Sequence, residues 1–172
     1  MKRSLSWLTR TAILLALTVL FQSLRVIMPF MPANISQYVV GSLVNLCLIV
    51  AAVTLGIKGG AVIAIVAPII AFLQGFTPFA MLVIPIALGN LVLVVAVALL
   101  YKKSMILAFV TGAIAKLVAL YIGVVLIVLP FFLPNAPAQL QLAFSWPQLV
   151  TASIGGVLAA LVLPILKKAV KY

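Results

Sequence analysis

The sequence predicts an all-α membrane protein, a single integral membrane domain over residues 1–172 with about six transmembrane helices and cytoplasmic N- and C-termini. Composition supports this, because 67% of the residues are apolar and only 6% are charged, whereas soluble domains carry about 25% charged residues. The apolar runs also match the roughly 20 residues that a helix needs to cross a bilayer. Finally, most Lys and Arg residues lie at every second connection between the apolar runs and at the two ends of the chain, which is typical of the cytoplasmic side of a membrane protein.

Prolines, glycines and charges set the limits of the predicted helices. The first ends at the turn Pro29–Pro32, the second at Lys58-Gly59-Gly60 and the fourth at Lys102-Lys103. The third run is short and contains Pro68, so we expect it to be tilted or buried among its neighbours. Prolines and polar residues after the fifth run predict a loop with a short surface helix. The expected helices span residues 11–28, 37–57, 61–73, 79–100, 105–129 and 148–166.

The orientation follows from the basic residues beside the helices, because Lys and Arg are retained on the cytoplasmic side of a membrane. With the N-terminus inside, the three outer loops hold no basic residue, and only Arg25 and Lys116 lie elsewhere. We therefore expect a multi-pass protein of the cell membrane. The cytoplasmic set is Lys2, Arg3, Arg10, Lys58, Lys102, Lys103, Lys167, Lys168 and Lys171.

The chain contains no Asp, Glu or His, which excludes several kinds of chemistry. We expect no acid-base catalysis, no metal site and no enzyme activity, because each needs those side chains. No Walker motif is present, so the chain cannot bind ATP through one, and no cofactor is expected. The formal charge of +11 would suggest nucleic acid in a soluble protein, but the apolar runs indicate lipid instead. The single cysteine, Cys47, is expected to pack in an apolar run.

Lys116 is the strongest anomaly in the apolar sequence. It lies about 12 residues, or about 18 Å, into the fifth predicted helix. A Lys at the centre of a membrane helix costs about 2.5 to 3.5 kcal/mol, and no carboxylate in this chain can neutralise it. Backbone carbonyls, a water-filled cavity or an anionic ligand could stabilise the ammonium group. Lys116 is therefore a candidate binding residue, with a structural role as the alternative.

Four other polar side chains lie at comparable depths and complete a candidate binding site with Lys116. They are Gln22 and Arg25 in the first helix, Asn45 in the second and Asn90 in the fourth. The alternatives are an interfacial anchor for Arg25 and helix-to-helix hydrogen bonds for the two asparagines. Two cations without any acid favour an anionic substrate, with a carboxylate or a phosphate.

Ala12 and Ala16 form a pair of small residues four positions apart, next to Arg10 at the cytoplasmic end of the first helix. Such spacing lets helices approach closely in lipid. The pair could serve packing within the bundle or the docking of a partner protein.

Several segments together resemble the S components of energy-coupling factor (ECF) transporters, small membrane proteins that capture vitamins. The similarity covers nearly the whole chain and includes the number of predicted helices and their orientation. The matching segments are Ala12-Ile13-Leu14-Leu15-Ala16, Gly41-Ser42-Leu43-Val44-Asn45, Ala87-Leu88-Gly89-Asn90, and Gly155-Gly156 to Lys167-Lys168.

The resemblance implies that the protein works with partners. In such proteins the alanine motif contacts a membrane coupling subunit, and two cytoplasmic ATPase subunits supply the energy. The substrate enters from outside into a cavity closed by outer loops, after which the subunit is thought to topple in the membrane. By this analogy residues 29–36, 74–78 and 130–147 are lid candidates. The expected substrate is an anionic, carboxylate-bearing vitamin, with pantothenate, lipoate, biotin and folate as examples.

Two other functions fit the residues. In a structural or assembly subunit of a membrane complex, Lys116 would pair with an acidic residue of another protein. A stand-alone facilitator or channel would transport without partners, but the sequence has no charged ring or repeated filter motif that would indicate a pore.

Overall fold

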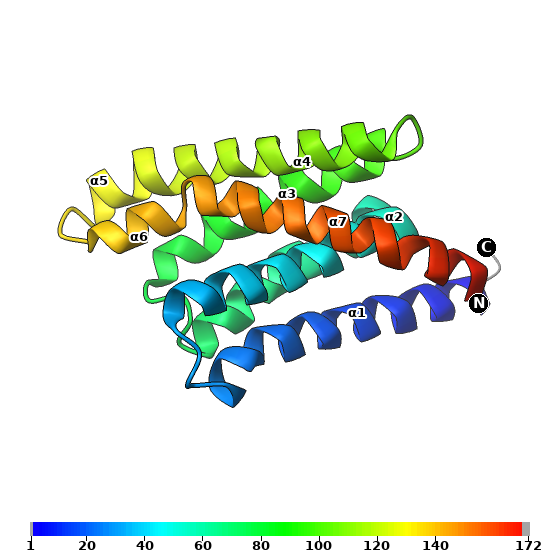
Figure 1. The fold of residues 1–172 in the computed structure, drawn as a ribbon, viewed down its shortest axis with the longest axis horizontal. Helices are drawn as coiled ribbons and strands as arrows, with labels where there is room; N and C mark the ends of the chain where they lie inside the picture. Colours follow the sequence, from blue (N-terminus) through cyan, green and yellow to red (C-terminus); the bar gives the residue numbers. More distant parts are fainter. Residues whose placement is uncertain (1, 170–172) are drawn as a thin grey trace.

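The computed structural model describes residues 2–169, which form a bundle of helices without any strand in that range (Figure 1). Among the described residues, five helices are long and apolar enough to cross a membrane, by length and composition. The predicted all-α class and the multi-pass membrane character are confirmed. The five apolar segments are Leu5–Ile27, Asn34–Leu73, Ala80–Leu100, Met105–Phe132 and Ala138–Lys168.

The first and last helices extend beyond their predicted limits. Helix α1 spans Lys2–Ile27 instead of beginning at residue 11, and α7 spans Trp146–Ala169 instead of residues 148–166. The prediction was wrong here because an apolar run marks only the part of a helix that lies in lipid. Polar residues such as Lys, Arg and Gln also favour helix, so the helix continues past the run.

Helix α2 (Ala33–Leu73) contains both the second and the third predicted helix, which accounts for five long helices instead of six. Its break lies at Gly56, with φ 70° and ψ −168°, and not at the predicted Lys58-Gly59-Gly60. Only glycine adopts this conformation without strain, because it has no Cβ. Gly60 remains helical, and a Cβ there would lie 2.4 Å from Val94 Cγ1. Its small size therefore serves close packing.

The break at Gly56 folds α2 back on itself into two arms, residues 33–55 and residues 57–73. Ser36 in the first arm and Ala71 in the second line the same cavity, although a straight helix would separate them by about 50 Å. Figure 1 shows the two arms running antiparallel, the first in blue to cyan and the second in green. The six-span topology with cytoplasmic termini, which counts each arm as a span, stays a prediction.

The second half of the chain contributes α3 (Val83–Leu100), preceded by the 3₁₀ turn η1 (Ala80–Leu82), and α4 (Met105–Leu120). Helix α4 continues through the π-helix η2 (Tyr121–Val128) into α5 (Leu129–Phe132). The fifth predicted helix therefore runs past residue 129, because Pro130 lies in the first turn of α5, where its missing N–H is tolerated. The expected short helix of the following loop is α6 (Ala138–Ala143).

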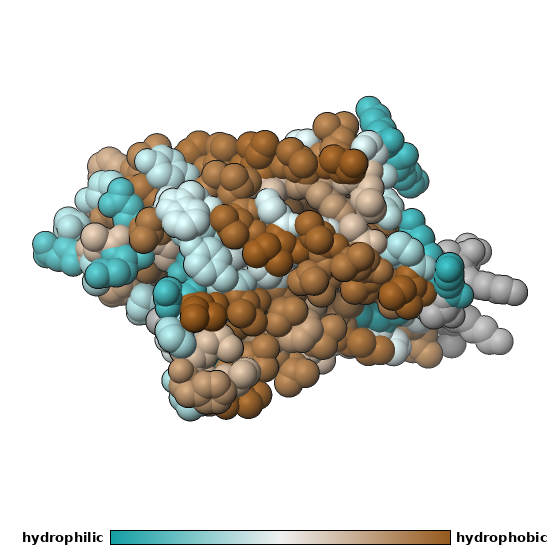
Figure 2. Space-filling model, in the orientation of Figure 1, coloured by the Kyte–Doolittle hydropathy of each residue, from teal (hydrophilic) through white to brown (hydrophobic). Residues whose placement is uncertain are grey.

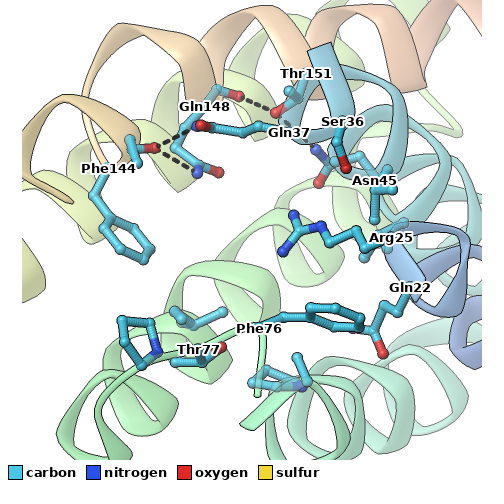
Figure 3. Close-up of a pocket in the computed structure, with 18 of the residues that line it drawn as sticks. Gln22, Arg25, Ser36, Gln37, Asn45, Phe76, Thr77, Phe144, Gln148 and Thr151 are labelled. Atoms are coloured by element: carbon cyan, nitrogen blue, oxygen red, sulfur yellow. Dashed lines mark hydrogen bonds between the residues drawn. The ribbon is translucent and has the colours of Figure 1, made fainter. Parts of the chain in front are cut away.

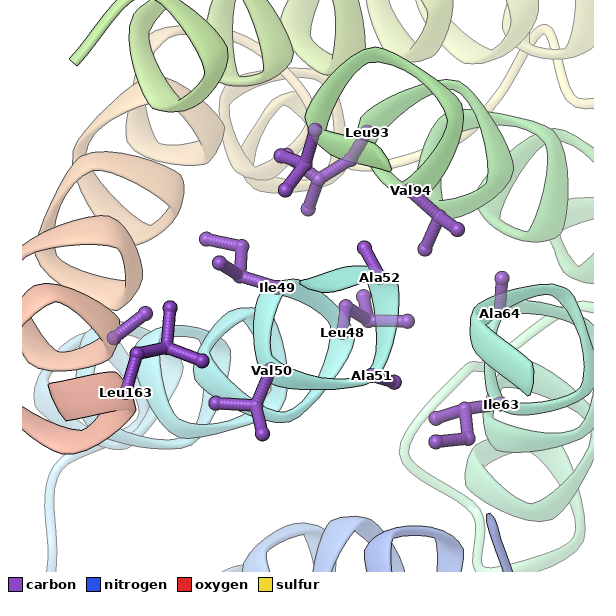
Figure 4. Close-up of a cluster of buried hydrophobic side chains, with 12 residues drawn as sticks. Leu48, Ile49, Val50, Ala51, Ala52, Ile63, Ala64, Leu93, Val94 and Leu163 are labelled. Atoms are coloured by element: carbon purple, nitrogen blue, oxygen red, sulfur yellow. The ribbon is translucent and has the colours of Figure 1, made fainter. Parts of the chain in front are cut away.

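The main apolar core surrounds the first arm of α2. Leu48 and Ile49 are fully buried there, together with Ile63 from the second arm, Leu93 from α3 and Leu163 from α7 (Figure 4). Helix α2 thus packs against α1, α3 and α7, while α4 packs against α3 and α7.

The two ends of the bundle differ in character. The basic end contains the start of α1, the break in α2, the α3–α4 turn and the end of α7 (Figure 1). Trp7 donates to the carbonyl of Leu55 at 3.4 Å, and Lys167 to the hydroxyl of Tyr101 at 3.1 Å. The opposite, loop end contains residues 28–32, 74–79 and 133–145. On the face shown in Figure 2, apolar side chains cover most of the surface between the ends. Lys171 lies outside the described residues.

Candidate functional site

A cavity of about 730 Å³ lies toward the loop end of the bundle, between α1, both arms of α2, α3, α4 and α7. Its volume falls in the range of small-molecule sites, roughly 300 to 1,000 Å³. The lining includes every residue that the sequence predicts for the binding site, namely Gln22, Arg25, Asn45, Asn90 and Lys116.

Lys116 lies in the wall of the cavity and is only 4% exposed. Its Nζ donates to Asn45 Oδ1 at 2.6 Å and to Asn90 Oδ1 at 2.8 Å. Three helices meet in this cluster, since Asn45 belongs to the first arm of α2, Asn90 to α3 and Lys116 to α4. The side-chain amide oxygens of Asn45 and Asn90 therefore accept hydrogen bonds from the ammonium group, which also borders the polar cavity. A water-filled cavity was among the predicted partners of Lys116, but the two asparagines were not.

A second layer of hydrogen bonds connects this cluster to α7. Asn45 Nδ2 donates to Thr151 Oγ1 at 3.3 Å, and the Thr151 hydroxyl donates to the carbonyl of Gln148 at 3.1 Å. The two helices come this close because Gly155 has no side chain. A Cβ on Gly155 would lie 2.9 Å from the carbonyl oxygen of Ser42, closer than real Cβ contacts.

Arg25 extends from the last turn of α1 into the cavity (Figure 3). Its guanidinium carbon lies 5.3 Å from the centre of the Phe76 ring, which is cation–π geometry. Within the described part of the chain the guanidinium has no hydrogen bond or ion pair. Because the sequence has no Asp or Glu, Arg25 and Lys116 both lack a side-chain counter-charge. The cavity therefore carries net positive charge.

Gln22 connects α1 to the second arm of α2. Its Nε2 donates to the carbonyl of Ala67 at 3.1 Å, while its Oε1 is buried and has no partner. An unsatisfied buried acceptor costs about 1 to 3 kcal/mol. Gln22 thus has a packing role and also an acceptor that a ligand or a water molecule can use.

Several residues of the cavity wall were not predicted from the sequence. Gln37 and Gln148 lie at the starts of α2 and α7, where a polar residue next to an apolar run was a usable signal. Phe76 and Phe144 could not be predicted, because the sequence does not distinguish a loop aromatic residue that lines a cavity from one that does not. Each predicted lid segment contributes to the lining, through Pro29–Pro32, through Phe76 to Pro78, and through Leu140, Ala143 and Phe144.

Ala12 and Ala16 are both exposed on α1. Only 17% of the most apolar window of α1 is buried, the smallest share among the five apolar segments. The two alanines are therefore not part of the packed interior of the bundle. Large apolar neighbours share the exposed surface of the helix, including Leu8, Ile13 and Leu20. This surface is open to lipid or to another membrane protein.

A model of the family "ECF transporter, substrate-specific component" matches residues 7–167 of the chain. The chain belongs to this family. The resemblance seen in the sequence is thereby confirmed. ECF substrate-specific components are substrate-binding subunits of transporters and not enzymes, and they associate with an ECF module of ATPases and a T component. No curated protein and no solved structure matches the chain significantly.

Membership of the ECF substrate-specific components makes the cavity the candidate substrate site of this subunit. It combines a lining from five long helices, a guanidinium without a hydrogen bond in the described structure, and a hydrogen-bonded cluster of amides around Lys116. The Lys116 ammonium faces inward, so an acidic residue of another protein would have to enter the cavity to reach it. The assembly-subunit hypothesis therefore loses its main argument.

Proposed function

We propose that this ECF substrate-specific component is the high-affinity binding subunit of a vitamin importer, that its substrate carries a carboxylate, and that partner ATPases energise transport. The observation that carries the proposal is Arg25, a cation inside the cavity without hydrogen bond or counter-ion in the described structure. The sequence also contains no Asp or Glu, so no acidic side chain of this protein can neutralise Arg25, and an anionic ligand can.

The charges favour an anionic group, and a carboxylate fits them on physical grounds. Arg presents a planar fork of N–H donors that matches a carboxylate with two parallel hydrogen bonds. Lys116 reinforces this attraction at a distance, because charge interactions are screened less inside a protein cavity than in bulk water. A neutral ligand would leave both positive charges uncompensated.

The substrate-binding set of the proposal comprises Arg25 and Lys116 as cations, with Asn45, Asn90 and Gln22 as polar wall residues. The amides are held before any ligand arrives, by Lys116 for the asparagines and by the Ala67 carbonyl for Gln22. A preorganised site orders fewer side chains on binding, which favours high affinity.

The partner-docking set is Ala12 and Ala16, whose exposure on α1 allows a helix of the membrane coupling subunit to approach closely. In this proposal the basic end of the bundle faces the cytoplasm of the cell, where the ATPases lie, and the loop end faces outward. The substrate then enters past the loops at residues 29–36, 74–78 and 130–147.

The test is mass spectrometry of small molecules released from the purified protein, with the variants Arg25→Gln and Lys102→Gln purified in parallel. Lys102 is an exposed cation at the basic end and serves as the matched control. We expect a carboxylate-bearing compound with the native protein and with Lys102→Gln, and its loss with Arg25→Gln. Retention of a neutral compound that Arg25→Gln leaves unchanged would refute the proposed substrate class.

Liposome assays distinguish the proposed importer subunit from a stand-alone facilitator. Uptake of the released compound should need the ATPases and the T component in the same membrane. Uptake by this protein alone, without ATP, would instead favour a stand-alone facilitator.

A further inference from the structure

The hydrogen bonds of the cavity wall determine which way each side-chain amide points. A protonated Lys can only donate, so the oxygens of Asn45 and Asn90 must face Lys116 and their NH₂ groups must point away from it. The Asn45 NH₂ group uses one hydrogen for Thr151. The Asn90 NH₂ group has no partner among the described residues. The deep wall of the cavity therefore presents donors.

Arg25 adds further donors to the cavity, from the loop end of α1. None of its N–H groups has a hydrogen-bond acceptor within the described chain, and the side chain reaches into the cavity (Figure 3). The Lys116 ammonium also has a third hydrogen beyond the two that the asparagines accept. Anionic and carbonyl oxygens of a ligand fit these donors.

Three glutamines present the opposite pattern. Gln37 Nε2 and Gln148 Nε2 both donate to the carbonyl of Ala143, at 3.3 and 2.9 Å, and Gln22 Nε2 donates to that of Ala67. A carbonyl can only accept, so each NH₂ group must face it and each Oε1 must point elsewhere. None of the three Oε1 atoms has a partner in the described structure. These residues offer acceptors to the cavity.

Donors and acceptors both occur along the length of the cavity. Gln37 precedes Asn45 by eight residues of one helix, which is about 12 Å along its axis. Gln148 likewise precedes Thr151 by about one turn of α7. On α2 the acceptor Gln37 therefore lies nearer the loop end than the donor Asn45. On α1, in contrast, the donor Arg25, in the last turn beside Phe76, lies nearer the loop end than the acceptor Gln22. Figure 3 shows Gln37 and Gln148 together on one wall, with Arg25 projecting beneath them.

We infer that the ligand has two chemically different groups: a carboxylate bound by Arg25, and a hydroxyl or N–H group that donates to Gln37 and Gln148. This inference rests on the proposed function and narrows its substrate class. A carboxylate without such a donor leaves both glutamine oxygens without a partner once water is displaced, which costs affinity.

Matched pairs of carboxylates test the inference in the purified protein. Biotin and lipoate share a valerate chain on a ring, but only biotin has ring N–H donors. 8-Hydroxyoctanoate and octanoate differ only in a terminal hydroxyl. Each probe is added in excess, and its dissociation constant is obtained from the shift of the thermal unfolding midpoint. We expect the donor-bearing member of each pair to bind about tenfold more tightly or better.

Variants assign the effect to its residues. Gln37→Met with Gln148→Met keeps side-chain length and removes both acceptors, so the donor-bearing member should lose its advantage. If the double variant does not fold, the advantage of the donor-bearing probe is compared between the native protein and the single variant Gln148→Met, where it should be smaller. An advantage that persists undiminished in these variants would overturn the assignment to the glutamines.

The failures of the inference and of the proposed function can be distinguished. Equal binding within both pairs, weakened for all probes by Arg25→Gln, would refute the inference and support the carboxylate site. No shift with any probe would count against both.

Discussion

Lys116 Nζ lies 2.6 Å from Asn45 Oδ1, although 71 positions separate the two residues in the sequence. With Asn90 as the second acceptor, the ammonium group joins α2, α3 and α4 at the wall of the cavity. A positive charge inside an apolar bundle thus has amide oxygens as partners and no anion from its own chain. The same cluster orients the amides and keeps the cavity positively charged.

Removing Lys116 should destabilise the protein. In Lys116→Met two buried amide oxygens lose their donor, at about 1 to 3 kcal/mol each, partly offset because a buried charge disappears. We expect a lower thermal unfolding midpoint in detergent. Adding Asn90→Leu should cost less in this background than in the native protein, with a coupling energy of about 1 kcal/mol. Strict additivity of the two substitutions would contradict the hydrogen bond, and Lys103→Met at the exposed basic end is the control.

Gly56→Ala should strain the break in α2. A side chain at φ 70° and ψ −168° costs about 1 to 3 kcal/mol, although nothing lies within 4 Å of the added Cβ. The unfolding midpoint should therefore fall while helix content by circular dichroism stays the same. Ile57→Ala, at an exposed neighbouring residue, should change the midpoint less. Equal effects of the two variants would show that Gly56 does not require its glycine conformation.

Adjacent glycines of α7 should differ in their tolerance of a methyl group. In Gly155→Ala the new Cβ meets backbone atoms of α2, 2.9 Å from Ser42 O and 3.0 Å from Leu46 N, so the helices must separate. We expect a loss of about 1 to 3 kcal/mol in stability and weaker ligand binding, because Asn45 moves away from Thr151. Gly156→Ala meets the Phe109 side chain at 3.3 Å and should be milder. The reverse order of midpoints would contradict the close approach of α2 and α7.

Bulky residues on the exposed face of α1 should separate docking from ligand binding. We expect Ala12→Leu with Ala16→Leu to lose co-purification with the T component and the ATPases, since a close helix contact needs small residues. Binding of the released ligand by the subunit alone should be unchanged, because neither alanine lines the cavity. Val110→Leu on the exposed face of α4 is the control for a larger lipid-facing side chain. Intact complexes with the double variant would rule out this face as the docking surface.

The polar residues of the candidate site could be predicted because polar groups inside an apolar helix are costly and must face a polar interior. Lys116, Arg25 and Asn90 were identified on that ground, and all three line the cavity. Helix limits were less predictable, since Gly56 and Lys58-Gly59-Gly60 are equally plausible turns in the sequence. Which glycine adopts a positive φ depends on packing against neighbours such as Val94.

The sequence by itself determined that this chain is a helical membrane protein, that its buried charges are all positive, and that an anion would suit them. Only the tertiary structure decided that Lys116 is held by Asn45 and Asn90, and that Gln37 and Gln148 both donate to the Ala143 carbonyl in the wall of the same cavity. The reason is physical: the cost of burying a charge is a local property of the chain. Which group satisfies that charge depends on how helices distant in sequence pack together.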